Sequence, residues 1–87
     1  MKTIWKFYVL SSQYTLMPEG AKILSAAGQR GDTVIWAQVD PTAREIKRRL
    51  DLYETGQRMP DDPGTFIGTV LHDDGDCVVH VFDAGPA

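Results

Sequence analysis

The segment "PTAREIKRRLDLYETG", from Pro41 to Gly56, decides whether this chain is purely β or contains a helix. Pro at its start, followed by Ala, Arg, Glu, Lys and Leu, is typical of the beginning of a helix. The same residues also fit a strand. The residues at even positions from 46 to 52, three of which are Ile or Leu, would lie on one side, and the charged or aromatic residues at odd positions from 47 to 53 on the other. Helical spacing would instead group Ile46, Leu50 and Tyr53 on one face. The local pattern leaves both structures open.

The segments before this stretch predict strands. "TIWKFYVL" (3–10) is rich in β-branched and aromatic residues that alternate, and "YTLMP" (14–18) predicts a short second strand. "AKILSAA" (21–27) and "TVIWAQVD" (33–40) flank the Gly-rich connection "GQRGD", which has the length of a hairpin turn. We expect these two segments to form an antiparallel hairpin.

The segments after it predict a second hairpin. "TFIGTVL" (65–71) and "CVVHVF" (77–82) are separated by "HDDGD", which contains Asp-Gly. Asp-Gly is a strong short hairpin signal, because a type I′ turn needs left-handed backbone at both central residues. The tail "DAGPA" is expected to be loose.

Size and composition indicate one globular domain. The chain has 87 residues, of which 43% are hydrophobic, 24% charged and 9% aromatic, which is close to the average for globular proteins. Its apolar runs are far shorter than the roughly 20 residues of a membrane span, and no secretory leader pattern follows the N-terminus. The single cysteine, Cys77, cannot form an internal disulfide or a structural zinc site by itself. We therefore expect a cytoplasmic protein that does not contact membranes.

The charge is unevenly distributed. Residues 1–58 carry all nine Lys and Arg against six acidic residues, whereas residues 59–87 carry six Asp and no Lys or Arg, for a net charge of −3. An acidic chain argues against direct binding of nucleic acid, which requires a basic surface. The acidic final third favours a partner with a basic surface instead.

No set of catalytic or metal-binding residues can be assembled from the sequence. His72 and His80 with the nearby Asp residues lack a known metal-ligand spacing, and we interpret them as a solvated turn and a hydrogen-bonded strand histidine. Cys77 and His80 are three residues apart, so one strand would point them to opposite faces. We therefore expect no enzyme activity, no metal and no cofactor.

The basic cluster "REIKRR" (44–49) allows two interpretations. A run of charges is usually a solvated strand edge that discourages aggregation. The same guanidinium groups could also bind an acidic protein, a phosphate or a nucleotide.

Taken in order, the blocks "MKTIWKF", "MPEGAKILSA", "VIWAQVDP", "RRLDLYETGQRMP", "FIGTV" and "VVHVFD" resemble a family of short uncharacterised proteins of tailed bacteriophages and prophages. That family shares a pattern of the form "WALvDP", "RtFrvyGTGqplP", "yiGTv" and "lVwHvfE". The resemblance covers nearly the whole chain and implies a strand for the counterpart of residues 49–53, which favours strand over helix there. This chain departs from the pattern at Asp51 and at Glu54, where the family often has Gly. The resemblance implies a phage accessory protein and supplies no catalytic residues.

The predicted fold is all-β: about six antiparallel strands in a small barrel or sandwich, with room for a short helical turn around residues 41–45. Exposed strand edges could pair with a second copy, so a homodimer is compatible with this fold.

The leading hypothesis for function is a non-catalytic phage product that binds and modulates, by inhibition, a host protein, for example as an anti-CRISPR or another inhibitor of bacterial defence. One alternative is a protein that sequesters a small ligand or nucleotide between Arg48, Arg49, Arg58 and Trp36, and another is a minor virion component. The candidate interaction residues are Arg48, Arg49, Thr55, Gln57, Arg58, Asp61, Asp62, Asp73, Asp74 and Asp76.

Overall fold

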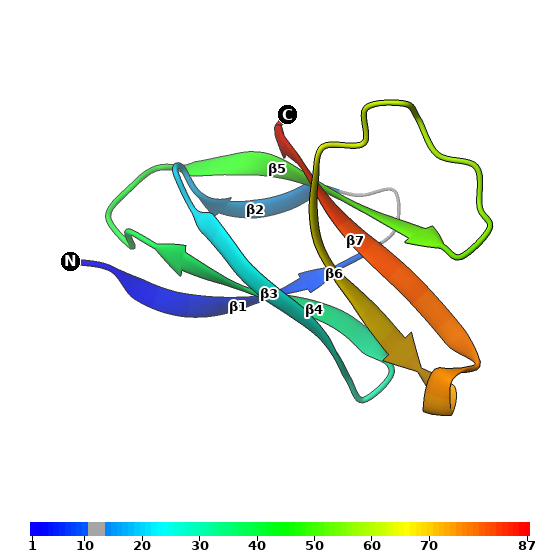
Figure 1. Ribbon diagram of the computed structural model, residues 1–87. Helices are drawn as coiled ribbons and strands as arrows, with labels where there is room; N and C mark the ends of the chain where they lie inside the picture. The colour runs from blue at the N-terminus through cyan, green and yellow to red at the C-terminus, as the bar shows by residue number, and fades with distance from the viewer. Residues whose placement is uncertain (11–13) are drawn as a thin grey trace.

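Strands make up nearly all of the regular structure in the computed structural model, which describes residues 1–10 and 14–87 (Figure 1). The strands are β1 (Thr3–Val9), β2 (Tyr14–Pro18), β3 (Lys22–Gln29), β4 (Asp32–Val39), β5 (Glu45–Glu54), β6 (Thr65–His72) and β7 (Cys77–Pro86). One antiparallel sheet has three strands in the order β1-β4-β3, and the other has four in the order β2-β5-β7-β6. The all-β prediction is confirmed, with seven strands where about six were expected, and the arrangement is the sandwich of the two predicted architectures.

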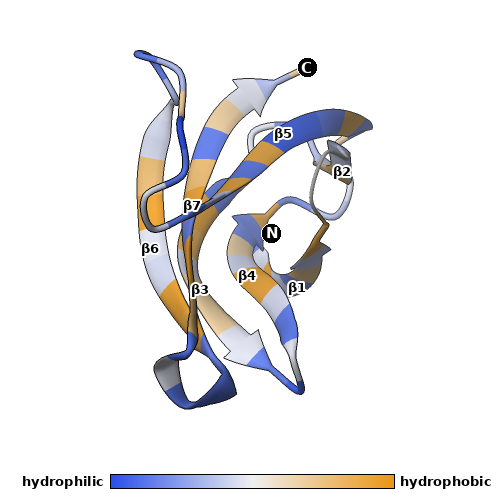
Figure 2. Ribbon diagram, turned by 90° about the vertical axis from the view of Figure 1, so that its right-hand side faces the viewer, coloured by the Kyte–Doolittle hydropathy of each residue, from blue (hydrophilic) through white to orange (hydrophobic). Residues whose placement is uncertain are grey.

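The segment that was open between helix and strand is β5. Its side chains alternate as a strand requires: Leu50 is fully buried, and Leu52 packs against the core from the same side of the strand. Figure 2 shows the same alternation as bands of apolar and polar residues along β5. The strand interpretation is confirmed.

The helical turn expected around residues 41–45 is wrong, because a tight turn replaces it. The Ala43 N–H donates to the Asp40 carbonyl at 3.0 Å, and the Asp40 carboxylate accepts from the Thr42 N–H at 2.9 Å. An Asp side chain that bonds the backbone two residues later mimics a turn and competes with helix formation. The chain therefore enters β5 directly from this turn.

The two predicted hairpins both exist, but only the first has a two-residue turn. Between β3 and β4, Arg30 and Gly31 have φ of 52° and 85°, as a type I′ turn requires. Between β6 and β7 the turn is longer than two residues, since His72 pairs with Cys77 and four residues connect them. The left-handed backbone that Asp-Gly predicts is nevertheless present, with φ of 55° at Asp74 and 94° at Gly75.

The tail is not loose, because β7 continues to Pro86. Beyond Phe82 it pairs with the first half of β5, where Gly85 lies opposite Arg49 after a bulge in the register. This extension brings Asp83 beside β5, which matters for the placement of Arg48 below.

The core lies between the two sheets. Its fully buried members come from both layers: Ile35 from the three-stranded sheet, and Met17, Leu50 and Val81 from the four-stranded sheet. Burial of each such side chain contributes roughly 1.5–3 kcal/mol to folding. Each sheet therefore has one covered face and one outer face.

Candidate functional site

The connection between β5 and β6, residues 55–64, crosses over β7, and we name it the crossing loop. β5 and β6 lie on opposite sides of β7 and both run antiparallel to it, so they are parallel to each other. The chain that leaves the end of β5 must therefore return past β7 before β6 can begin. Figure 1 shows this loop as the yellow-green connection between the two strands.

One contact places the start of the crossing loop on the outer face of the four-stranded sheet, and another holds its end against the backbone of β7. Near its start, Thr55 Oγ1 lies 2.8 Å from His80 Nε2. His80 stands between two buried valines of β7, so strand alternation points it away from the core. At its end, Gly64 lies so close to β7 that a Cβ on it would be 2.8 Å from Ala84 Cα.

Aromatic side chains gather on this outer face. The rings of Tyr53 and Phe82 meet edge to face with centroids 5.7 Å apart, and those of Phe66 and Phe82 lie 5.4 Å apart. Phe66 remains 55% exposed. We name as the aromatic face this cluster together with the other exposed apolar side chains on the same side of the sheet: Tyr14, Leu16, Tyr53, Phe66, Leu71 and Phe82.

His80 joins the crossing loop to the sheet. Its Nδ1 lies 2.9 Å from Thr69 Oγ1 on β6, and its Nε2 bonds Thr55 on the loop. Both ring nitrogens are therefore occupied by hydroxyl groups, which fixes the ring orientation. His80 is the hydrogen-bonded strand histidine that the sequence predicted.

Charged side chains border the aromatic face along β5. Arg49 Nε lies 3.1 Å from the carboxylate of Asp51, two residues further along the same side of the strand. The Lys47 ammonium lies 5.9 Å from the centroid of the Tyr14 ring, which is a cation–π distance. The outer face thus combines aromatic, guanidinium and ammonium groups. Of these, aromatic and guanidinium groups are enriched at protein interfaces.

Arg48 points the other way, toward the interior. Its Nε and Nη2 donate to the two carboxylate oxygens of Asp83 at 2.9 and 2.6 Å, and its Nη1 donates to the Ala21 carbonyl at 3.1 Å. Both side chains are only 13% exposed. Burial raises the pKa of Asp83, but the hydrogen bonds from Arg48 and from the Gly85 N–H, with the charge of Arg48, outweigh it and lower the pKa below its ordinary value.

The Thr55-Gly56-Gln57 turn that begins the crossing loop is closed by its own side chain. The Glu54 N–H donates to Gln57 Oε1 at 2.9 Å, and the Gln57 N–H donates to the Glu54 carbonyl at 3.0 Å. Gly56 has a φ of 87°, in the left-handed region that favours glycine. Gln57 and Thr55 therefore each have a defined bonding role here.

Replacing Gln57 with alanine should release the Glu54 amide. We expect its hydrogen exchange to accelerate and the free energy of unfolding to fall by about 0.5–1 kcal/mol, the usual contribution of one hydrogen bond. Amide exchange measured by NMR checks this. Gln57→Glu keeps an acceptor oxygen and serves as the control that retains protection. Unchanged exchange at Glu54 in the alanine variant would contradict the bond.

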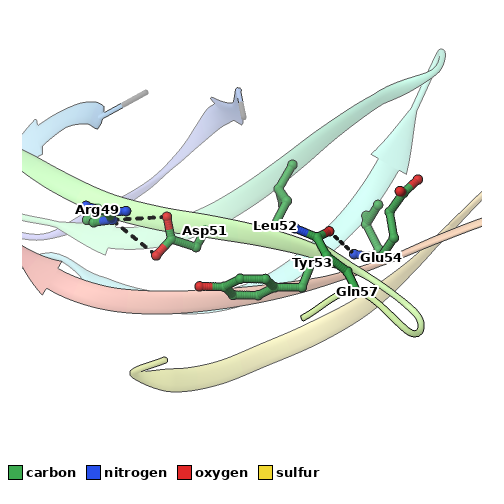
Figure 3. A pocket seen from close by; sticks show the side chains of 7 residues that line it. Arg49, Asp51, Leu52, Tyr53, Glu54 and Gln57 are labelled. Carbon is green, nitrogen blue, oxygen red and sulfur yellow. Dashed lines mark hydrogen bonds and ion pairs between the residues drawn. The ribbon is translucent and has the colours of Figure 1, made fainter. Parts of the chain in front are cut away.

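A cavity of about 500 Å³ opens beside the end of β5. Figure 3 shows the Arg49–Asp51 pair at one end of it, the Gln57–Glu54 bond at the other, and the Tyr53 ring lying along the sheet between them. The lining residues are Arg49, Asp51, Leu52, Tyr53, Glu54, Gln57 and Val79.

The structure divides the candidate interaction residues among three places. Arg49 lies on the outer face of the four-stranded sheet, and the loop residues belong to a loop whose Thr55 bonds that face. Arg48 points inward and is paired with Asp83. A third group belongs to the β6–β7 turn: Asp73, Asp74 and Asp76. Of these, Asp76 lines a cavity of about 300 Å³ together with Thr55 from the start of the crossing loop. The first group comprises Arg49, Thr55, Gln57, Arg58, Asp61 and Asp62.

The ligand-binding set of the alternative hypothesis is not brought together. Trp36 lies in β4 between buried Ile35 and Ala37, so it faces the outer side of the three-stranded sheet. Arg49 faces the outer side of the other sheet. The thickness of the sandwich therefore separates them.

Within residues 1–10 and 14–87 no group of three or more His, Cys, Asp or Glu side chains could hold a metal ion. In the same part of the chain, no helix is long and apolar enough to cross a membrane.

The sequence did not single out the aromatic cluster as a surface. Tyr53, Phe66 and Phe82 come from three strands, and each is a residue type that is often buried in a core. Parity could have found two of them, because Tyr53 and Phe82 occupy the opposite side of their strands from the buried Leu50 and Val81. Parity fails for Phe66, which a bulge between Phe66 and Gly68 turns to the outer face. Parity becomes usable only when the core side of each strand is known.

One family model, described as Domain of unknown function (DUF7352), matches residues 1–87. No curated protein and no solved structure matches the chain.

Proposed function

The chain belongs to the DUF7352 family, a domain of unknown function, over residues 1–87, and we propose that it is a non-catalytic domain that binds another protein through the aromatic face and the crossing loop. The observation that carries the proposal is the exposure of apolar side chains on the aromatic face, with Phe66 55% and Leu71 64% exposed. Aromatic residues that stay in contact with water are typical of protein interfaces.

The crossing loop adds charge to this surface. Asp61 and Asp62 lie on the loop and are exposed, and Arg58 precedes them. Acidic groups beside an apolar patch favour a partner whose surface has basic groups around an apolar centre. This combination supports one occupant, a protein with a basic rim at its binding groove.

The resemblance to short proteins of tailed phages supports a more specific form of the proposal. In that form the chain is a phage or prophage accessory protein, its partner is a host protein, and binding inhibits that protein. An inhibitor of a bacterial defence system, such as an anti-CRISPR protein, is the clearest example. Such inhibition needs only occupation of a functional surface and no catalytic group.

Affinity capture from host lysate, followed by measurement of the dissociation constant with the purified captured protein, tests the proposal. We expect Phe66→Ser to weaken binding at least about tenfold, since a central aromatic contact commonly contributes more than 1.4 kcal/mol. The matched control is Ile4→Ser, because Ile4 is 59% exposed on the other sheet. Circular dichroism verifies that both variants fold.

Equal affinity of the wild type, Phe66→Ser and the Ile4→Ser control would overturn the aromatic face as the contact surface. Failure to capture any specific host protein would count against the host-protein form. Charge reversal separates the two acidic regions: Asp61→Lys with Asp62→Lys should weaken binding, whereas Asp73→Lys with Asp74→Lys should not.

A second function, sequestration of a small anionic ligand, is favoured by one observation. The cavity beside β5 is about 500 Å³ and has a guanidinium, a phenol and an amide in its lining, which is within the size range of small-molecule sites. Thermal unfolding with a panel of nucleotides tests it, because a ligand that binds only the folded state raises the unfolding temperature. A rise that Arg49→Ala abolishes would favour this function over protein binding.

A further inference from the structure

A further cavity opens on the outer face of the three-stranded sheet, away from the aromatic face. Its volume is about 450 Å³, and we name it the hairpin cavity because the β3–β4 turn forms one side of it. Lys6 and Tyr8 of β1 alternate with Phe7, which packs against the core, so strand alternation points both of them outward. The lining residues are Lys6, Tyr8, Gln29, Arg30 and Asp32.

The ammonium group of Lys6 is held in place at the hairpin cavity. Its Nζ donates to Gln29 Oε1 at 2.9 Å and lies 5.2 Å from the centroid of the Tyr8 ring. An ammonium group has three N–H donors, so the bond to Gln29 leaves the others for a ligand. Because these contacts position the charge before a ligand arrives, less side-chain freedom is lost when one binds.

Arg30 occupies a position where its residue type strains the backbone. Its φ is 52°, in the left-handed region. The first central position of a type I′ turn favours Asn, Asp or Gly, which adopt this region at lower cost than Arg does. Strained residues concentrate at functional sites, where the side chain has a role that the turn alone does not require. The strain at Arg30 therefore points to a function of its guanidinium group.

The two positive side chains of the hairpin cavity are not neutralised by a neighbouring carboxylate. Lys6 and Arg30 make no ion pair within residues 1–10 and 14–87, and residues 11–13 are Ser, Ser and Gln, which carry no carboxylate. The lining contains one acidic side chain, Asp32, against these two. Like charges that share a small volume repel each other, and an anion between them replaces repulsion by attraction. The hairpin cavity is therefore suited to an anion.

The acidic β6–β7 turn lies at the same end of the molecule as the β3–β4 turn (Figure 1). It contacts the hairpin from the core side, because His72, which precedes it, bonds the buried Thr33 with 2.9 Å between Nε2 and Oγ1. The hairpin cavity lies on the opposite side of the same hairpin. In the part of the chain that the structure describes, Asp73 and Asp74 make no ion pair with Arg30. The turn therefore leaves the positive groups of the cavity available.

We propose that the hairpin cavity binds a phosphate group, free or in a phosphate monoester, through Lys6 and Arg30. A guanidinium group presents a planar set of donors that matches phosphate oxygens, and an ammonium group adds a point charge. The cavity volume is within the range of small-molecule sites, and Tyr8, 53% exposed, offers apolar surface to the organic part of a monoester. The inference is independent of the proposed function, because the aromatic face belongs to the other sheet.

The probes for the test are adenosine monophosphate, inorganic phosphate and adenosine. Each is titrated into the whole isotope-labelled chain and followed by NMR, with the ionic strength held constant by sodium chloride. We expect adenosine monophosphate to shift the amide signals of Lys6, Arg30 and Gly31 saturably and to bind at least about tenfold more tightly than adenosine, which lacks the anion. Tighter binding of the monophosphate than of inorganic phosphate would assign the site to a monoester, and equal binding would assign it to free phosphate.

Protein variants locate the binding site. Arg30→Asn and Lys6→Met should each weaken adenosine monophosphate at least about tenfold, because each removes a charged donor. Arg30→Asn should at the same time raise the unfolding temperature, since Asn adopts the left-handed turn backbone at lower cost, so its lost affinity would not come from lost folding. The matched control is Lys22→Met, which removes a positive charge from β3 outside the cavity lining and should leave the affinity unchanged.

Three results would overturn the inference: no saturable shift with either phosphate compound, equal affinity for adenosine monophosphate and adenosine, or equal effects of Arg30→Asn and Lys22→Met. Nucleotide binding that Arg49→Ala abolishes and Arg30→Asn leaves intact would also overturn it, because the ligand would then occupy the cavity beside β5. Phe66→Ser should keep the affinity for adenosine monophosphate, and Arg30→Asn should keep binding of the partner protein. Failure of this inference therefore leaves the proposed function standing, and the reverse also holds.

Discussion

Replacing Gly64 with alanine should lower the free energy of unfolding by about 3 kcal/mol, because it combines backbone strain with a steric clash. Gly64 has a φ of 97°, which residues with a Cβ rarely adopt. A Cβ at this position would also overlap the Asp83 carbonyl oxygen and lie 2.8 Å from Ala84 Cα. Both neighbours are backbone atoms of a paired strand and cannot move aside. Urea denaturation measures the effect.

Gly56→Ala is the matched control. Gly56 also has a left-handed φ, 87°, but a Cβ there would meet nothing within 4 Å. Only the conformational strain remains, so we expect a loss of about 1 kcal/mol. If the two alanine variants were equally stable, close packing of the crossing loop on β7 would be contradicted.

Gly64→Ala should also affect binding. Relief of the clash requires the end of the crossing loop to move away from β7. Phe66 of the aromatic face lies only two residues after Gly64, so this movement should disturb its position. If the aromatic face binds a partner protein as proposed, we expect weaker binding of that partner than in Gly56→Ala at a temperature where both variants are folded.

Replacing Arg48 with methionine should cost about 3 kcal/mol, since it leaves the Asp83 carboxylate largely buried and unpaired. Both side chains are only 13% exposed, and Asp83 receives two hydrogen bonds from Arg48. Arg44→Met is the control, because the Arg44–Glu19 pair is 77% and 52% exposed and should contribute nothing measurable. Equal stability of the two variants would contradict a structural role for Arg48.

The Arg48–Asp83 pair should also make stability depend on pH in acid. The pKa of Asp83 is lowered in the folded chain, because the bonds from Arg48 and Gly85 outweigh the effect of burial. The pair's contribution is therefore complete above the ordinary Asp pKa of about 4 and is lost as pH falls through the lower, folded value. The stability difference between wild type and Arg48→Met should therefore stay constant from neutral pH down to about that ordinary pKa and shrink below it. A difference that stays constant in strong acid would contradict the assignment.

The strands and one turn could be predicted from short stretches of sequence. A strand side chain repeats its environment every two residues, so alternation in "REIKRRLDLYE" already placed Leu50 and Leu52 on one side. The turn at Arg30-Gly31 follows from the left-handed backbone that a two-residue hairpin needs. Asp74 and Gly75 have the left-handed backbone that Asp-Gly predicts, but the register of β6 and β7 leaves four residues to connect. Side-chain pattern alone does not reveal loop length.

The candidate site could be predicted only in part. Thr55 and Gln57 were singled out by the sequence, and both form hydrogen bonds that shape the crossing loop. Arg48 was placed on the correct side of β5, but its partner Asp83 is 35 positions away and was assigned to a loose tail. The sequence pattern could not distinguish a basic residue that faces solvent from one that meets a carboxylate in the interior.

By itself the sequence determined the strand segments, the all-β class and the alternation along β5, because these depend on residues two positions apart. Tertiary structure decided that Tyr53, Phe66 and Phe82 meet on one outer face, and that the loop of residues 55–64 crosses β7. Those features depend on the strand order β2-β5-β7-β6. Strand order follows from contacts between distant segments, and no local period in the sequence specifies such contacts.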